Sequence, residues 1–411
     1  IGNVPHLRFP KFSGEWEICK VSELLDFYST NSLSWEQLEY GTKAIMNLHY
    51  GLIHVGLPTM VDLTRDNLPN IKEDNMPKNF ELCKEGDVAF ADASEDTNEV
   101  AKPIEFFDLA GKNIVCGLHT IHGRDNKNKT VIGFKGYAFS SSAFHNQIRR
   151  IAQGTKIYSI STKNFSECFI GIPSKVEQTK IATLLRLIDE RIATQNKIIE
   201  KYESLIKGLN DSLYAQYGDD VLTSFSSLGF SYSGLSGKSA QDFGSGKPFI
   251  TYLNVYSNNI INEKDFQYVA IKEGEKQNVV EYGDVLFTLS SETPEEVGIG
   301  SVYLGNENVY LNSFCFGIHI INTKIAFPPY LSYYVSSTPF RKFIYPYAQG
   351  STRFNLCKVD FEKASIKLPS LENQKRIYSI LSHIESKTET EKSLLDLYNS
   401  QKQYLLRQMF I

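Results

Sequence analysis

The sequence predicts an α+β fold in which two similar mixed α/β domains are joined by two long antiparallel helices that form a coiled coil. Three observations support this fold class. A segment near the middle of the chain is repeated at its C-terminal end, each copy shows a heptad pattern, and β-branched runs separated by turn residues precede each copy. A length of 411 residues suits two domains of ordinary size with connectors. Such a repeat predicts halves related by a pseudo-two-fold axis.

The internal repeat is clearest when the chain is shifted by 196 residues against itself. From "AQGTK" (152–156), paired with "AQGST" (348–352), the alignment runs without a gap to the C-terminus, and about 15 of roughly 64 paired positions are identical. The likeness returns upstream in "GDVAF" (86–90) and "GDVLF" (283–287), whereas the stretches between differ almost completely. Similar ends with dissimilar middles predict one scaffold that carries two different recognition surfaces.

The first copy of the repeat predicts a long helix. Ser174 and Glu177 form the S-x-x-E pattern of a capping box, which satisfies two backbone N–H groups at a helix start, and Gly218 supplies a stop signal. Apolar residues recur at alternating spacings of four and three, a coiled-coil seam with one polar interruption at Gln195. The apolar seam residues expected to pack are Ile181, Leu185, Ile188, Ile192, Ile199, Tyr202 and Leu209.

The second copy keeps this seam with weaker signals. Asn373 replaces the capping glutamate, and Thr388, Glu391 and Lys402 occupy seam positions. Half-polar seams associate weakly with themselves, so each helix is expected to need the other, and the second must then run back antiparallel to the first. The alternative is two unrelated helices, each packed on its own domain. The expected apolar seam is Ile377, Leu381, Ile384, Leu395, Tyr398 and Leu405.

The globular halves show short strand-like runs. Each half is therefore predicted to contain a twisted, mostly antiparallel sheet. The runs are "GDVAF" (86–90), "NIVCGLHTI" (113–121), "KPFITYLNVY" (247–256), "GDVLFTL" (283–289) and "VYLNSFCFGIHII" (309–321).

Composition narrows the class of protein. No run approaches the ~18 uncharged apolar residues of a membrane span. The six cysteines are scattered without a C-x-x-C pair, which predicts buried, reduced thiols in a cytoplasmic protein rather than a structural zinc site or a disulfide framework. The net charge of −4 is unlike the basic footprint of a general nucleic-acid binder, so tight DNA binding would need basic partners.

Four strings resemble catalytic or metal-binding motifs and fail on inspection. "FPPY" (327–330) lacks the Asn or Asp with which an amino methyltransferase accepts a hydrogen bond, and a pair of prolines at a helix start explains it better. "SGLSGKS" (233–239) and "FGSGKP" (243–248) lack the glycine spacing of a phosphate loop. "HTIH" (119–122) lacks the helical spacing and the carboxylate partner expected of a metal site. We therefore expect no catalytic residue, metal or cofactor in this chain.

Basic residues cluster where the globular parts meet the helical parts. Such groups suit phosphate contacts beside polar, base-reading loops, for which the sequence offers Ser290–Thr293 and Asp92–Glu95. The alternative for each basic residue is a solvated surface charge. The candidate DNA contacts are Arg124, Lys127, Lys129, Arg149, Arg150, Thr155, Lys156, Ser290, Ser291, Thr293, Arg341, Lys342, Ser351 and Arg353.

Three motifs together resemble the DNA specificity subunit of type I restriction–modification systems. They are the opening "VPHLRFPKFSGEWE" (4–17), the duplicated "AQG[ST]" junctions and the paired helix starts "[IL]PS-x-x-x-Q-x-x-I". The resemblance spans the whole chain and implies a target-recognition domain at 1–154, a central helical spacer at 155–217, a second target-recognition domain at 218–350 and a C-terminal helical spacer at 351–411.

The resemblance also implies a function and partners. Each recognition domain would read one half of a bipartite, asymmetric site in double-stranded DNA, and the coiled coil would set the spacer length. Two modification (methyltransferase) subunits would dock around the helices, and restriction (translocase/endonuclease) subunits would join them. S-adenosylmethionine, ATP and Mg²⁺ would belong to those partners, so this subunit would be non-catalytic. The alternative is an adaptor that does not bind DNA and whose helical rod scaffolds two protein partners.

Overall fold

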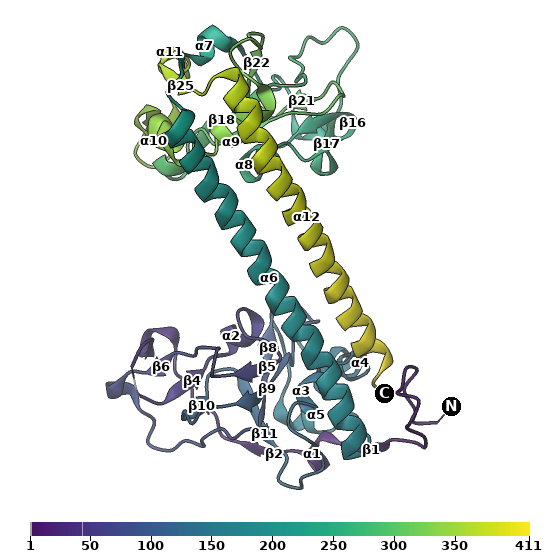
Figure 1. The fold of residues 1–411 in the computed structure, drawn as a ribbon. Helices are drawn as coiled ribbons and strands as arrows, with labels where there is room; N and C mark the ends of the chain where they lie inside the picture. The colour runs from purple at the N-terminus through teal and green to yellow at the C-terminus, as the bar shows by residue number, and fades with distance from the viewer. Residues whose placement is uncertain (1, 43) are drawn as a thin grey trace. The chain divides into compact units, whose positions relative to one another are not determined.

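The computed structural model describes residues 2–42 and 44–411. The chain forms two compact units (Figure 1). Unit 1 comprises Ile1–Asn196 with Ser393–Ile411, and unit 2 comprises Lys197–Lys392. The two long helices, α6 (Lys175–Tyr217) and α12 (Leu371–Gln408), each contribute one part to unit 1 and the other part to unit 2.

Unit 1 contains a five-stranded sheet and a four-stranded sheet. The five strands have the order β2-β11-β7-β9-β5, antiparallel except for the β9–β5 pair, and the four have the order β10-β4-β6-β3. The strands are β1 (Glu17–Lys20), β2 (Asp26–Tyr28), β3 (Leu38–Glu39), β4 (Met46–Leu48), β5 (Met60–Asp62), β6 (Asn70–Ile71), β7 (Val88–Ala91), β8 (Ala93–Ser94), β9 (Pro103–Asp108), β10 (Ile114–Cys116), β11 (Thr120–Arg124), β12 (Tyr158–Ser159) and β13 (Phe169–Ile172). The helices besides α6 and α12 are α1 (Val21–Leu24), α2 (Tyr50–His54), α3 (Lys135–Phe139), α4 (Ser142–Ile151) and α5 (Thr162–Ser166).

Unit 2 contains a four-stranded antiparallel sheet of order β15-β22-β18-β20 and two three-stranded sheets of orders β17-β16-β21 and β19-β24-β23. The strands are β14 (Val221–Thr223), β15 (Gly229–Ser233), β16 (Phe243–Ile250), β17 (Gln267–Val269), β18 (Val285–Thr288), β19 (Ser290–Ser291), β20 (Gly300–Val302), β21 (Tyr310–Leu311), β22 (Cys315–Ile320), β23 (Ala348–Gln349), β24 (Phe354–Leu356) and β25 (Ile366–Leu368). The other helices are α7 (Phe225–Leu228), α8 (Tyr252–Ser257), α9 (Pro328–Tyr334), α10 (Thr338–Ile344) and α11 (Lys358–Lys363).

Local sequence signals set several element ends. The run 247–256, expected to be one strand, is a strand only to Ile250, because the side chain of Thr251 accepts a hydrogen bond from the N–H of Asn254 and starts α8. Pro328 lies in the first turn of α9, which confirms the helix-start interpretation of "FPPY". At the start of α6, the hydroxyl of Ser174 accepts from Glu177 N–H at 3.4 Å, which is one of the two bonds of the predicted capping box, whereas the Glu177 carboxylate pairs with Arg8 at 2.7 Å.

The two long helices pair antiparallel within each unit. In unit 1 the start of α6 packs with the end of α12, since Leu185 and Leu405 share one buried core and Asp189 pairs with Lys402 at 2.6 Å. In unit 2 the end of α6 packs with the start of α12, where Leu209 packs against the core that contains Leu381. The antiparallel pairing of the helices is therefore confirmed, and so is the fold class of mixed α/β domains with two long helices, whereas the pseudo-two-fold relation of the halves stays a prediction.

Each unit has its own apolar core, to which the helices contribute. The buried seam residues are Ile181, Leu185, Ile188, Ile199, Ile377, Leu381 and Leu405, and the half-buried ones are Ile192, Tyr202, Leu209, Ile384, Leu395 and Tyr398. The polar seam residue Thr388 is buried, and its hydroxyl donates to the carbonyl of Ile384 at 2.9 Å. Within the described part of the chain, every helix is too short or too polar to cross a lipid bilayer.

Candidate DNA-recognition surfaces and their helical connections

In unit 1, a tight turn follows α4 at the end of the first globular part. Gln153 and Ser159 exchange backbone hydrogen bonds of 3.0 and 2.8 Å across it. Gly154 has a φ of +141°, and a Cβ there would lie 1.9 Å from the carbonyl oxygen of Ile157, so only glycine fits. The predicted contact residues that are exposed at this junction are Arg149, Arg150, Thr155 and Lys156.

Strand pairing joins this turn to the polar loop 92–95. Tyr158 of β12 lies opposite Ser94 of β8, and the N–H of Ile160 donates to the carbonyl of Asp92 at 2.9 Å. The loop predicted to read bases and the basic turn predicted to contact phosphates are therefore neighbours in unit 1.

Unit 2 has a turn of the same construction. Gly350 has a φ of +142°, and a Cβ there would lie 2.1 Å from the carbonyl oxygen of Arg353. β24, which follows the turn, pairs with β19, so that Ser291 lies opposite Phe354. Ser351 and Arg353 are exposed in this turn. The structure again brings a predicted basic turn and a predicted polar loop together.

Arg341 holds the polar loop of unit 2 from inside. Its guanidinium donates to three backbone carbonyls within residues 295–298 at 2.6–2.7 Å, and burial lowers its pKa. These bonds use the donors that a phosphate contact would need, so we assign Arg341 a structural role instead. The neighbouring Lys342 is exposed.

The serines of β19 also support the loop rather than face solvent. Ser290 and Ser291 are buried, whereas Thr293 is exposed. Ser291 donates to the Glu296 carboxylate at 3.1 Å, and Tyr256 donates to the same carboxylate at 2.8 Å. The hydrogen bond from Tyr256 is the main cause that lowers the pKa of Glu296.

Arg124 is the clearest correction to the predicted contacts. It is only 7% exposed and binds both carboxylate oxygens of Asp87 at 2.8 Å, with a further ion pair to Glu81 at 2.6 Å. A guanidinium bound in this way is not available to a phosphate. Lys127 donates to a backbone carbonyl at 2.7 Å, and Lys129 forms a surface ion pair of 2.7 Å.

The histidines of "HTIH" do have carboxylate partners, contrary to the expectation from sequence. His119 Nδ1 lies 3.1 Å from Asp92, and His122 Nε2 lies 2.7 Å from Asp87. The expectation was wrong because both partners precede the histidines by more than 25 residues and reach them through strand pairing between β7 and β11.

Gln178 and Gln374, to which the sequence analysis gave no role, bind the starts of the long helices to their globular parts. The amide of Gln178 donates to the carbonyls of Pro173 and Lys129 at 2.8 and 3.0 Å, and its oxygen accepts from the N–H of Val131 at 2.9 Å. Both side chains are fully buried. Their identity in both copies of the repeat was the signal that could have revealed them.

Gln374 makes the corresponding contacts in unit 2. Its amide donates to the carbonyls of Pro369 and Ile325 at 2.8 and 2.7 Å, and its oxygen accepts from the N–H of Phe327 at 2.8 Å. A second contact also recurs, because Tyr137 donates to Asp189 at 2.7 Å in unit 1 and Tyr333 donates to Glu385 in unit 2. The start of each long helix is thus fixed to its globular part by buried hydrogen bonds.

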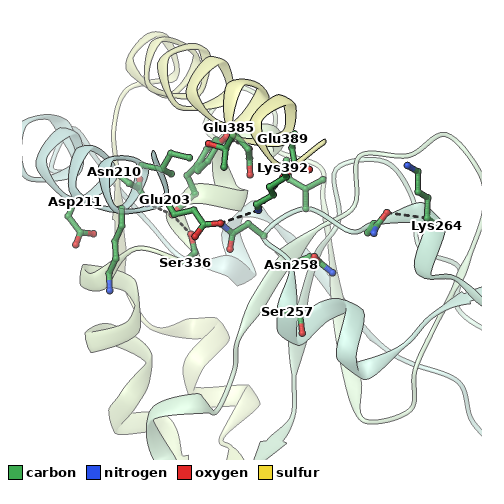
Figure 2. A pocket seen from close by; sticks show the side chains of 17 residues that line it. Glu203, Asn210, Asp211, Ser257, Asn258, Lys264, Ser336, Glu385, Glu389 and Lys392 are labelled. Carbon is green, nitrogen blue, oxygen red and sulfur yellow. Dashed lines mark hydrogen bonds and ion pairs between the residues drawn. The ribbon is translucent and has the colours of Figure 1, made fainter. Parts of the chain in front are cut away.

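Unit 2 also contains a pocket of about 710 Å³ between its parts of α6 and α12 and the segment after α8. Figure 2 shows Lys392 reaching toward Glu203, with which it forms an ion pair of 3.1 Å. Charged residues of both signs line the pocket, among them Asp211, Lys264 and Glu389. Small-molecule sites are mostly apolar, so this lining suits a polar contact surface better than a cofactor site.

Comparison with known proteins agrees with these features. Residues 236–397 match the family model of the type I restriction modification DNA specificity domain. Among curated proteins, a sequence search gives no match.

Two solved structures share the fold across nearly the whole chain. A type I restriction–modification S subunit from M. genitalium is 16% identical, with a TM-score of 0.52 and coverage of 99% of both chains. A chain from a study of complex assembly and conformational transition of the type I R-M system is also 16% identical, with a TM-score of 0.59 and coverage of 95% of this chain and 96% of that chain. The comparisons therefore show a specificity-domain match over residues 236–397 and a fold that the whole chain shares with these two structures.

Proposed function

We propose that this chain is the non-catalytic specificity subunit of a type I restriction–modification complex. In this proposal it recognises a bipartite DNA site, and the globular part of each unit reads one half-site. The observation that supports this most directly is the pair of glycine turns, Gly154–Lys156 and Gly350–Arg353, each joined by strand pairing to a polar loop. Basic groups on a turn position a protein on the phosphate backbone, and polar loops beside them can reach base edges in the major groove.

The proposed DNA contacts are the predicted residues whose side chains stay exposed or half-buried. Arg124 and Arg341 are bound by groups of the protein itself, and Ser290 and Ser291 are buried, so the proposal excludes these four. The remaining candidates are Lys127, Lys129, Arg149, Arg150, Thr155, Lys156, Thr293, Lys342, Ser351 and Arg353. Because the net charge is −4, we propose that basic partner subunits contribute much of the DNA affinity.

The long helices are proposed to set the spacer between the half-sites. Each helix begins at a buried glutamine clamp, so a change in helix length is expected to be transmitted to its globular part rather than absorbed by a flexible joint. We further propose that two modification subunits dock around the helices, in part through the polar pocket of unit 2, and that restriction subunits join them. S-adenosylmethionine, ATP and Mg²⁺ would then act in those partners, in the cytoplasm.

A paired insertion tests the spacer proposal. Seven residues that continue the heptad are inserted after Asn196 in α6 and after Lys392 in α12, which preserves the antiparallel seam. Seven helical residues add about 10 Å, close to the rise of about three base pairs. Methylome sequencing of cells that also express the modification subunit is expected to show a longer spacer and unchanged half-sites.

A domain exchange is the control for the paired insertion. Exchange of residues 1–150 for those of a relative is expected to change one half-site only, with the spacer unchanged. Altered half-site bases after the paired insertion would contradict the spacer role. A chain that fails to shift DNA in gel electrophoresis, with and without its methyltransferase partner, would contradict DNA recognition itself and favour an adaptor.

A further inference from the structure

Three buried side chains in unit 1 form a cluster that DNA recognition does not use. Cys83 precedes β7, Cys116 ends β10 and His122 lies on β11. Their potential ligand atoms all lie within 4.8 Å of one another, and the three residues are buried. Among the residues described, 2–42 and 44–411, this is the one group of three such side chains with metal-ligand geometry.

The two sulfur atoms are spaced as zinc ligands are. Their separation is 3.6 Å. Two thiolates bound to one tetrahedral Zn²⁺ at about 2.3 Å each are about 3.8 Å apart. The two sulfur atoms therefore need only a small adjustment to bind one ion together.

His122 presents a nitrogen that has no other partner. Its Nε2 lies 2.7 Å from Asp87, and an ionised carboxylate can only accept, so Nε2 carries the proton. That tautomer leaves the lone pair on Nδ1, which is buried and makes no hydrogen bond. Fully buried polar atoms without a partner are rare and call for an explanation, and a bound cation supplies one here.

Asp87 completes an arrangement that is common around protein-bound zinc. Metal-binding histidines usually donate their other N–H to a carboxylate, which fixes the ring and strengthens it as a ligand. Asp87 is itself held by two 2.8 Å bonds from Arg124. The buried Arg124, which the sequence suggested as a DNA contact, thus has a place in this arrangement.

Charge balance favours a divalent ion. Two thiolates and Zn²⁺ sum to zero, and Asp87 is offset by Arg124, so the occupied site adds no net charge to a buried region. Soft thiolate and imidazole ligands also select zinc over Mg²⁺ or Ca²⁺.

Unit 2 provides an internal contrast. Its aspartate at the same point of the repeat, Asp284, accepts hydrogen bonds from Tyr232 at 2.6 Å and interacts with His319 at 2.8 Å. There the histidine contacts the carboxylate through Nδ1, and its side chain is partly exposed. The thiols and the buried free nitrogen belong to unit 1.

We propose that Cys83, Cys116 and His122 are three ligands of a Zn²⁺ ion in unit 1. The ion would join the four-stranded sheet, through Cys116 on β10, to the five-stranded sheet, through His122 on β11. The proposal does not rest on the DNA-recognition function, and each can fail without the other.

The test uses the full chain, purified without a polyhistidine tag or chelator. Mass spectrometry of the metal content is expected to give one zinc per chain, lost in Cys83→Ser and Cys116→Ser. Cys168→Ser is the matched control, since Cys168 is buried in the same unit outside the cluster. Asp87→Asn is expected to weaken zinc binding by about 10–100-fold.

Two measurements on the unmodified chain cover the case in which the variants do not fold. Replacement of the ion by Co²⁺ is expected to give a thiolate-to-cobalt charge-transfer band in the near ultraviolet. Removal of the metal is expected to lower the Tm of unit 1, and Zn²⁺ alone is expected to restore it. The proposal is overturned if the reduced wild-type chain takes up neither Zn²⁺ nor Co²⁺, if Cys116→Ser retains its zinc, or if the freshly isolated chain contains a Cys83–Cys116 disulfide.

Discussion

Removal of the glutamine clamp in unit 1 is expected to lower stability by a predictable amount. Gln178→Ala deletes three hydrogen bonds in a fully buried position. At about 1 kcal/mol of net stability for each, the loss is about 3 kcal/mol. For domains of about 150–250 residues, 1 kcal/mol corresponds to about 2–4 °C, so the melting transition of unit 1 should fall by about 6–12 °C.

Differential scanning calorimetry of the full chain measures this effect, because two units can give two transitions. Gln401→Ala is the matched control: Gln401 is an exposed glutamine of α12. Gln374→Ala should lower the transition of unit 2 by a similar amount, since its three contacts are equivalent. A Gln178→Ala shift no larger than that of Gln401→Ala would refute the reasoning, because it would mean that the helix start is not held by this side chain.

Three further predictions follow from the recognition surfaces. Arg353→Ala is expected to weaken DNA binding at all sequences and to reduce the slope of log K against log[salt] by about 1. Arg341→Ala should instead lower Tm and leave that slope unchanged. Binding isotherms at several salt concentrations measure both slopes. Gly154→Ala places a Cβ 1.9 Å from a carbonyl oxygen and should lower methylation at one half-site. Gly208→Ala, in open space within α6, should raise the free energy of unfolding by up to about 1 kcal/mol. Equal methylation by the two variants would contradict the role of the turn. The pKa of Glu296 lies below its ordinary value of 4.5, so its hold on the loop is complete above that value and is lost as the pH falls through the lowered pKa. Hydrogen exchange of residues 290–297, corrected for intrinsic rates, should therefore rise in acid, and Glu296→Ala should show the raised exchange already at neutral pH.

Local patterns in the sequence were enough to predict the two long helices and the fold class. Apolar residues recur with a regular period in both α6 and α12, and this periodicity follows directly from helix geometry. The glycine of each junction repeats in "AQG[ST]", and the structure shows why, since both Gly154 and Gly350 adopt a positive φ with a carbonyl close by.

Contacts made through strand pairing could not be predicted in the same way. Arg124 resembles a surface cation in "HGRDNKNKT", yet the register of β11 against β7, in which Gly123 lies opposite Val88, brings it to Asp87, where its charge is neutralised. The same register brings His122 to that carboxylate, and Cys83 reaches Cys116 from 33 residues away. Such contacts depend on which strands become neighbours, and a single sequence carries little information about that.

The way unit 1 is completed has a consequence for biosynthesis. Phe410 packs edge-on against Trp16, and Leu405, Leu406 and Met409 belong to the same apolar core as Phe90. The first globular part is therefore made some 250 residues before the segment that fills its core, whereas unit 2 is continuous in the chain. On the ribosome, unit 2 can mature first, and a nascent chain interrupted near residue 400 would expose apolar surface at its beginning rather than at its end.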